Sequence, residues 1–220
     1  MNKVLFIGVL FCPLLWSCGN NSVEKTSIKR TFASKHSIYF NNGVDSLLIQ
    51  YDSLSNAFVN WDSAKVTLNA KALFDKLQNM PLTEKDLGDV KKDSTAFSRV
   101  NDNWKGAKSA ALFIASSADL DEKRKNFHKL SLNIFAFLRD MQYDNNKLYL
   151  QKCTMAFDDT GTGLWISKVE EINNPYLGKH HPRYKAGMLH CGENEEALDL
   201  SGVGTVQNSN NENGKSKGKK

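Results

Sequence analysis

Apolar residues recur at steps of three and four from residue 44 to residue 141, and this spacing constrains the fold more than any other feature of the sequence. Such a period places the apolar side chains on one face of a helix, which must be buried against another element. The first stripe consists of Val44, Leu47, Leu48, Tyr51, Leu54 and Phe58. The second consists of Val66, Ala70, Leu73, Leu77 and Met80. Asp62 or Ser63 is a suitable N-cap for this second helix, and Pro81 ends it.

Two further helices are predicted after the polar connector of residues 82–95. The third stripe consists of Trp104, Ala107, Ala111, Ile114 and Ala118. The fourth consists of Phe127, Leu130, Ile134, Phe137 and Met141. Asp119, with Glu122 three residues later, is a typical start for the last helix. Four amphipathic helices joined by modest loops predict a mainly α fold built on an antiparallel four-helix bundle.

A change of pattern after Tyr143 predicts a small irregular or β lobe at residues 144–200. Residues 147–155, "KLYLQKCTM", alternate and are rich in strand formers. The short apolar segment "LWIS" follows a turn. Residues 173–192 then contain two prolines and three glycines, which interrupt any regular helix. We expect this lobe to carry cysteine and methionine and to pack on the bundle.

The two ends of the chain predict an exported, lipid-anchored protein. Residues 1–17 have a positive start, an apolar run too short to span a membrane, and a small residue before Cys18. The stretch "LWSC" is similar to a bacterial lipobox, so we expect lipid on Cys18 and a place on the periplasmic side of the cell envelope. An ordinary cleaved secretory signal is the alternative. Residues 18–40 are expected to be a flexible tether, residues 41–200 the folded domain, and residues 201–220 a disordered basic tail.

The charge of the chain does not point to nucleic acid. The formal charge is +5, and four of the lysines that produce it lie in the last six residues. A basic tail can touch anionic lipid or nucleic acid. Export makes nucleic acid an improbable partner, and a solvated, disordered end explains the lysines equally well.

The cysteine and methionine residues are the most specific chemical feature of the folded part. Its two thiols, Cys153 and Cys191, each have a methionine nearby, Met155 and Met188. In a strand, Cys153 and Met155 project to the same face, and one turn brings Met188 to Cys191, with His190 between them. Thiolate and thioether are soft ligands that favour Cu(I). These five residues are therefore our candidate metal ligands.

Other interpretations of the same residues stay open. In an oxidising compartment a Cys153–Cys191 disulfide is the default for such a pair, with the methionines as core fillers and His190 on the surface. His180 and His181 are either exposed loop residues or outer metal ligands. No third group orients a Cys–His nucleophile pair, and no phosphate loop, HExxH or GxSxG motif is present. We therefore expect neither an enzyme nor a small-molecule substrate.

Several segments together resemble a domain of unknown function found in exported bacterial proteins. The helical elements of the resemblance are Arg124, Phe127, Leu130 and Ser131. The later elements are Cys153, Met155, Ala156, Trp165, Ser167, Asn174, Pro175, Tyr176, Gly178, Met188, Leu189, Cys191 and Gly192. The resemblance covers roughly residues 40 to 200, and its last fifty residues are the most specific part.

The resemblance implies a role with metals. Members look like lone periplasmic proteins or extensions of Cus-type membrane-fusion proteins in heavy-metal efflux. This implies copper or another soft metal at the Cys and Met positions, and efflux components as partners. Two features depart from the pattern, namely Thr154, where Pro is common, and the inserted segment "KHHPRYKA". The sequence thus predicts a lipid-anchored Cu(I)-binding protein, with a disulfide-stapled interaction module as the alternative.

Overall fold

The computed structural model describes residues 33–157 and 160–201, and in this part of the chain each of the four long helices begins at a polar cap. The helices are α1 (Ile38–Val59), α2 (Ser63–Gln78), α4 (Ser94–Ser116) and α5 (Leu120–Asp140). Asp62 caps α2, and Asp119 accepts hydrogen bonds from two backbone amides of α5. Both caps confirm the starts predicted from the sequence, because a short polar side chain satisfies the unpaired amides of a first helical turn.

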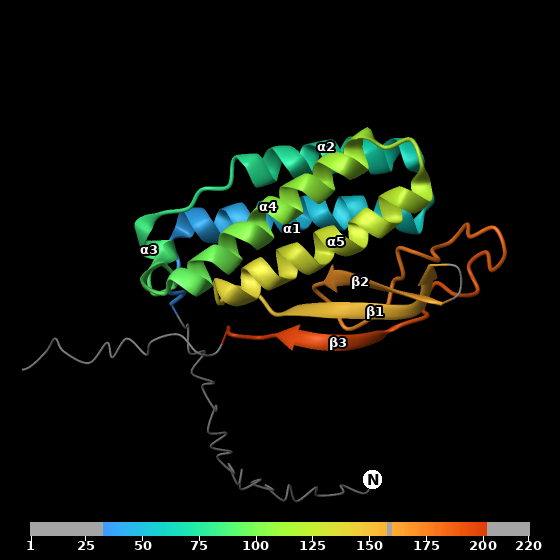
Figure 1. Cartoon of the computed structure of the whole chain (residues 1–220). Coiled ribbons are helices and arrows are strands. Elements are labelled where there is room, and N and C mark those ends of the chain that lie inside the picture. The colour runs from blue at the N-terminus through green and yellow to red at the C-terminus, as the bar shows by residue number, and fades with distance from the viewer. Residues whose placement is uncertain (1–32, 158–159, 202–220) are drawn as a thin grey trace, which may run out of the picture. The chain divides into compact units, whose positions relative to one another are not determined.

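The predicted apolar stripes form the core between these helices. Figure 1 shows the long helices lying alongside one another, with α2 packed against α1 and α4, and α4 packed against α5. Every residue of the first predicted stripe is buried. Met80 and Ala118 were expected inside helices, but they lie just beyond the ends of α2 and α4. The body is mainly helical, as predicted.

The polar connector between α2 and α4 contains two short helical turns. These are α3 (Glu84–Leu87) and the 3-10 helix η1 (Val90–Lys92). Thr83 and Asp86 form a reciprocal capping box at the start of α3. No apolar period marks these turns in the sequence, because turns this short bury little surface.

A three-stranded antiparallel sheet follows the helices. Its strands are β1 (Leu148–Phe157), β2 (Gly161–Ser167) and β3 (Glu193–Leu198), in the order β2-β1-β3. The first two were expected from the sequence, but β3 was not, because "ENEEAL" is acidic and lacks alternation. The backbone pairing of β3 with β1 holds this edge strand, and across it the Lys152 ammonium pairs with Glu193 at 3.1 Å and also with Glu195.

The sheet is fixed to the helices by buried polar contacts. The sheet lies along α5, which β2 contacts directly (Figure 1). The Tyr51 hydroxyl of α1 is 2.6 Å from the Ser131 hydroxyl of α5 and accepts a 3.0 Å hydrogen bond from the Ile166 amide of β2. His128 Nδ1 accepts a hydrogen bond of 3.1 Å from the Leu164 amide. These contacts position the C-terminal lobe.

Several predictions concern residues outside the described part of the chain. The predicted signal at residues 1–17, the lipidation site Cys18 and nearly all of the predicted basic tail belong to this group. Within the ranges that the structure does describe, no helix has the length and apolar character needed to cross a membrane.

Candidate thiol site

The two cysteines of the C-terminal lobe come together at one end of the sheet. Cys153 lies in β1 and is buried, and Cys191 lies two residues before β3 and is partly buried. Their sulfur atoms are 3.6 Å apart. Lys152 of β1 pairs with Glu193 of β3 in an antiparallel register. This pairing brings the segment that precedes β3, which contains Cys191, next to Cys153 of β1. The predicted convergence of the two thiols is therefore present.

Gly192 allows the chain to turn from the second thiol into β3. Its φ of +146° belongs to a region that side chains rarely adopt. A Cβ atom here would lie 2.6 Å from the Lys152 carbonyl oxygen and 3.0 Å from the Trp165 ring. Only glycine permits this close approach, so Gly192 helps to hold Cys191 beside Cys153.

Asn174 connects the "NPYLG" turn to the segment that carries the second thiol. Its side chain is fully buried and donates a hydrogen bond of 2.7 Å to the Cys191 carbonyl oxygen. Its Oδ1 atom accepts hydrogen bonds from the amides of Tyr176 and Leu177. The backbone N–H of Asn174 donates a hydrogen bond of 2.8 Å to the Leu189 carbonyl oxygen. One residue thus organises both segments, which the sequence did not reveal.

The same turn is attached to the end of α1. Gly178 has φ of +55°, and a Cβ atom there would lie 2.5 Å from the Val59 carbonyl oxygen. The Lys179 amide donates a hydrogen bond of 2.7 Å to that oxygen. The Trp61 indole donates a hydrogen bond of 3.0 Å to the Leu177 carbonyl. The lobe is therefore attached to the end of α1 by a backbone hydrogen bond and by the Trp61 indole.

Two aromatic residues of the family resemblance, Trp165 and Tyr176, are both buried in this lobe. Trp165 and Tyr176 are 2% and 1% exposed, and their ring centres are 6.0 Å apart. Gly163 is the β2 partner of Cys153, and a Cβ atom there would lie 2.6 Å from the Tyr176 ring. The missing side chain of Gly163 therefore leaves room for Tyr176.

The environment of Cys191 favours the neutral thiol. Burial, the hydrogen bond with Cys153 and charge repulsion from that sulfur raise the pKa of Cys191 to about 11. A thiolate is the form that binds metal or attacks a disulfide. Cys191 therefore needs a metal ion or another electrophile to displace its proton at neutral pH.

The other predicted ligands, Met155, Met188 and His190, do not all lie together with the two thiols. Met188 and Cys191 bracket one turn, in which the Cys191 amide donates to the Met188 carbonyl at 3.1 Å. The pairing of β1 is irregular between Cys153 and Phe157, so the alternation on which the sequence prediction relied is interrupted there. Met155 lines a cavity to which neither cysteine contributes. His190 is exposed, and its Nδ1 atom lies 2.7 Å from the Ile172 carbonyl oxygen.

The remaining histidines of the lobe form no cluster with the thiols. His180 is exposed. His181 Nδ1 accepts hydrogen bonds from the amides of Arg183 and Tyr184, both at 3.2 Å, so this atom stabilises a turn. No group of three or more His, Cys, Asp or Glu residues close enough to hold a metal occurs in the described ranges.

Comparisons with known proteins bear on the helical part. Residues 47–146 match the model of a family described as "Protein of unknown function (DUF3347)". The matched segment begins inside α1 and ends just before β1, so it includes Arg124 and Ser131 but neither cysteine. No curated protein and no solved structure gave a match. The family similarity thus concerns the helices, and the thiol site has to be argued from its geometry.

Proposed function

We propose that this chain is a lipid-anchored protein of the bacterial envelope that binds a soft metal ion, Cu(I), between Cys153 and Cys191. The observation that supports this most strongly is the 3.6 Å separation of two sulfur atoms from segments 38 residues apart. Thiolate sulfur is the donor that soft ions such as Cu(I) prefer. The metal is the cargo of the protein and not a catalyst.

The sulfur separation is suitable for a shared metal ion. With metal–thiolate bonds of about 2.3 Å, two sulfurs at this distance subtend an angle of about 103°, close to tetrahedral. A linear two-coordinate ion would need the sulfurs about 4.6 Å apart at the same bond length. We therefore expect the thiolates to provide two ligands of a site with three or four.

We assign the remaining ligands to the thioether and imidazole groups nearby. Met188 is the first choice, because it begins the turn that ends at Cys191. Met155 would have to turn from the cavity that it lines, and His190 would bind through Nε2, since its Nδ1 atom is next to the Ile172 carbonyl. Trp165 and Tyr176 would limit the access of water to the bound ion.

Binding should release protons. Because the pKa of Cys191 is raised to about 11, this thiol is protonated at neutral pH before the metal arrives. Metal affinity then rises with pH, since the ion competes with a proton for the sulfur. Cys191 holds its proton tightly, so metal binding at this site depends on the softness of the sulfur donors.

The proposal also includes the location of the protein and the role of its helices. Lipid on Cys18 would hold the protein at the periplasmic side of the membrane, and an antiparallel four-helix bundle would serve as a rigid scaffold for the lobe. The protein would buffer copper or transfer it to membrane-fusion components of a metal-efflux system. We propose a binding role rather than an enzymatic one for this protein.

A second candidate function is supported by the same distance. If the sulfurs approach by about 1.5 Å they reach the length of a disulfide bond. The crosslink would close a loop between β1 and β3 and contribute on the order of 3–4 kcal/mol to the free energy of unfolding. The protein would then be a disulfide-stapled module that binds an envelope partner without metal.

A competition titration distinguishes the two candidates. Reduced protein is titrated with Cu(I) in the presence of a chromophoric Cu(I) chelator, and the Cys153→Ser, Cys191→Ser double variant is compared with the wild type. We expect one tightly bound Cu(I) per chain, lost in the double variant and weakened at least tenfold in Met188→Leu. Val169→Leu, at an exposed apolar position, is the matched control and should bind as the wild type does. Equal copper uptake by the wild type and the double variant would exclude the metal site.

A further inference from the structure

The cavity that Met155 lines includes neither of the two thiols in its lining. Its volume is about 390 Å³, and it is formed where the start of α5 meets the end of β1 and the turn after Tyr176. Cavities of this size accommodate small organic molecules. Its polar wall contains Arg124, and its apolar wall contains Met155, Phe157 and Leu177.

Arg124 is the unusual residue of this cavity. Its side chain is only 4% exposed, and its guanidinium lies 3.7 Å above the Trp61 ring. Nη1 is 3.3 Å from the carboxylate of Asp121, which is itself 83% exposed. Among the described residues, Nε and Nη2 have no hydrogen-bond partner, although both are buried. A buried guanidinium with unpaired N–H groups destabilises the folded state unless an acceptor forms hydrogen bonds with them.

The side chains that line the cavity carry more positive than negative charge, although Lys125 also pairs with Glu122 at 2.8 Å, outside the lining. Arg124, Lys125 and Arg183 line the cavity, whereas Asp121 is its single carboxylate. Burial lowers the pKa of Arg124 to about 10, and Asp121 offsets this only in part. The cavity therefore favours an anion.

We propose that this cavity binds a small organic carboxylate, with the Nε and Nη2 edge of Arg124 pairing with its two oxygens. A guanidinium presents its N–H groups as a planar fork that matches a carboxylate in a bidentate manner. The apolar wall receives the hydrocarbon body of the ligand, which a bare phosphate ion lacks. Because both nitrogens are shielded from water, a side chain that covers them must move when the ligand binds.

This proposal is independent of the copper proposal, although Met155 belongs to both. The sequence offered no reason to expect a small-molecule ligand. Arg124 stands out in the sequence only as an element of the family resemblance, because its burial against Trp61 brings together residues far apart in the chain.

The test uses benzoate as the probe and calorimetry with NMR as the readouts. We expect saturable binding of benzoate by the folded wild-type chain, at least tenfold weaker binding by Arg124→Gln, and no effect of benzyl alcohol or inorganic phosphate. Arg99→Gln is the matched control, because Arg99 is an exposed arginine that pairs with Asp140 and does not line this cavity. Its affinity for benzoate should equal that of the wild type.

A readout on the unmodified protein keeps the test valid if Arg124→Gln does not fold. Benzoate should shift the indole N–H resonance of Trp61, which donates to the Leu177 carbonyl, and leave that of Trp104 unchanged. The absence of saturable benzoate binding, an unaffected Trp61 resonance, or equal affinity in a folded Arg124→Gln variant would overturn the proposal. Displacement of benzoate by phosphate would refute its preference for a carboxylate.

Discussion

The side chain of Asn174 donates a hydrogen bond of 2.7 Å to the carbonyl oxygen of Cys191, and this contact joins the "NPYLG" turn to the segment with the second thiol. Because Asn174 also accepts from two amides of its own turn, its removal leaves several buried polar groups without partners. The position of Cys191 therefore depends on a residue 17 positions earlier in the chain.

Replacing Asn174 should destabilise the lobe. We expect Asn174→Ala to lower the free energy of unfolding by about 3 kcal/mol, since each unsatisfied buried group costs about 1–3 kcal/mol. Asn173→Ala, at the exposed neighbouring position, should cost much less. Urea denaturation of both variants measures the difference, and equal midpoints would show that the buried contacts of Asn174 contribute nothing.

Gly192 should not tolerate a side chain. Gly192→Ala combines an unfavourable φ of +146° with a Cβ atom 2.6 Å from the Lys152 carbonyl, so we expect a loss of about 1–3 kcal/mol and a displaced Cys191. Gly187→Ala serves as the control, because a Cβ atom there would be 3.1 Å from the Tyr184 carbonyl oxygen and its φ is not in the strained region. Thermal unfolding and thiol accessibility together test this. A Gly192→Ala variant as stable as the wild type would contradict the close packing of β3 against Lys152.

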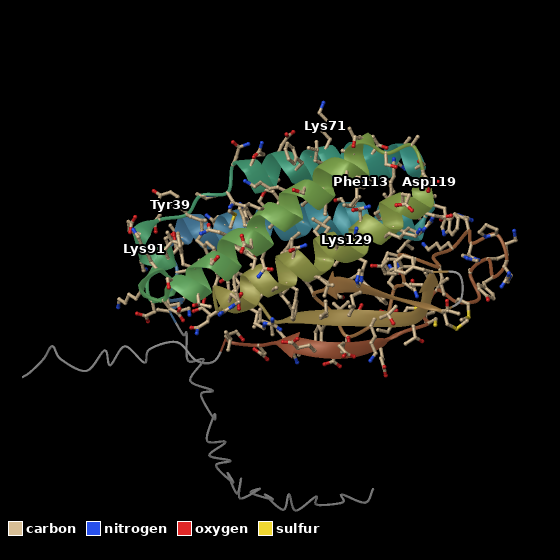
Figure 2. The ribbon with its side chains drawn as sticks, viewed as in Figure 1. Tyr39, Lys71, Lys91, Phe113, Asp119 and Lys129 are labelled. Carbon is tan, nitrogen blue, oxygen red and sulfur yellow. The ribbon has the colours of Figure 1, made fainter. Side chains whose placement is uncertain are left out.

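The Tyr51 hydroxyl should be important for attaching the sheet. Tyr51→Phe removes the hydroxyl that accepts from the Ile166 amide and contacts Ser131, which keeps its bond to the Phe127 carbonyl, so we expect a loss of about 1–3 kcal/mol while the ring still packs. Tyr39→Phe is the control, because Tyr39 is 67% exposed and Figure 2 shows it at the surface. Denaturation curves that coincide for the two variants would show that the hydroxyl does not stabilise the fold.

The pH dependence of the thiols follows from the raised pKa of Cys191. The folded pKa of about 11 exceeds the ordinary value of 9.0, so the unfolded chain loses this proton first as the pH rises. The contribution of Cys191 to stability is therefore complete below about pH 9 and is lost between pH 9 and pH 11. In the same interval, the rate of alkylation of Cys191 should increase in the wild type.

Removal of Cys153 should shift that profile. Cys153→Ala takes away the hydrogen bond and the repulsion that help to raise the pKa of Cys191, so alkylation should be faster at pH 8 than in the wild type. Rates measured by mass spectrometry from pH 7 to pH 11 check this. An unchanged profile would mean that the two sulfurs do not interact in solution.

The helices were predictable because their apolar residues repeat with the period of a helix. The stripe from Val44 to Phe58 is buried throughout, and Asp119 caps α5 through contacts that depend only on neighbouring residues. Met80 and Ala118 were placed wrongly because an apolar residue at the next step does not show where the last helical turn ends.

The lobe was harder to predict because its contacts join distant residues. Strand β3 is held by its backbone pairing with β1, a distant segment of the chain, and nothing in "ENEEAL" itself indicates a strand. The irregular pairing of β1 after Cys153 breaks an alternation that is regular in the sequence. Arg124 and Trp61 meet only after α1 and α5 pack. By contrast, the meeting of Cys153 and Cys191 was predictable, because thiols in an oxidising compartment pair by default and because a methionine lies near each cysteine.

Metal and thiol analysis of the same native sample tests the central claim most directly. Protein extracted from cells grown with copper is divided, and one half is analysed for metals while the other is treated with a thiol reagent before and after a Cu(I) chelator. The account predicts about one copper per chain and two thiols that become reactive when the chelator removes it. A sample without copper, whose two thiols appear only after chemical reduction, would contradict the account and identify the pair as a disulfide.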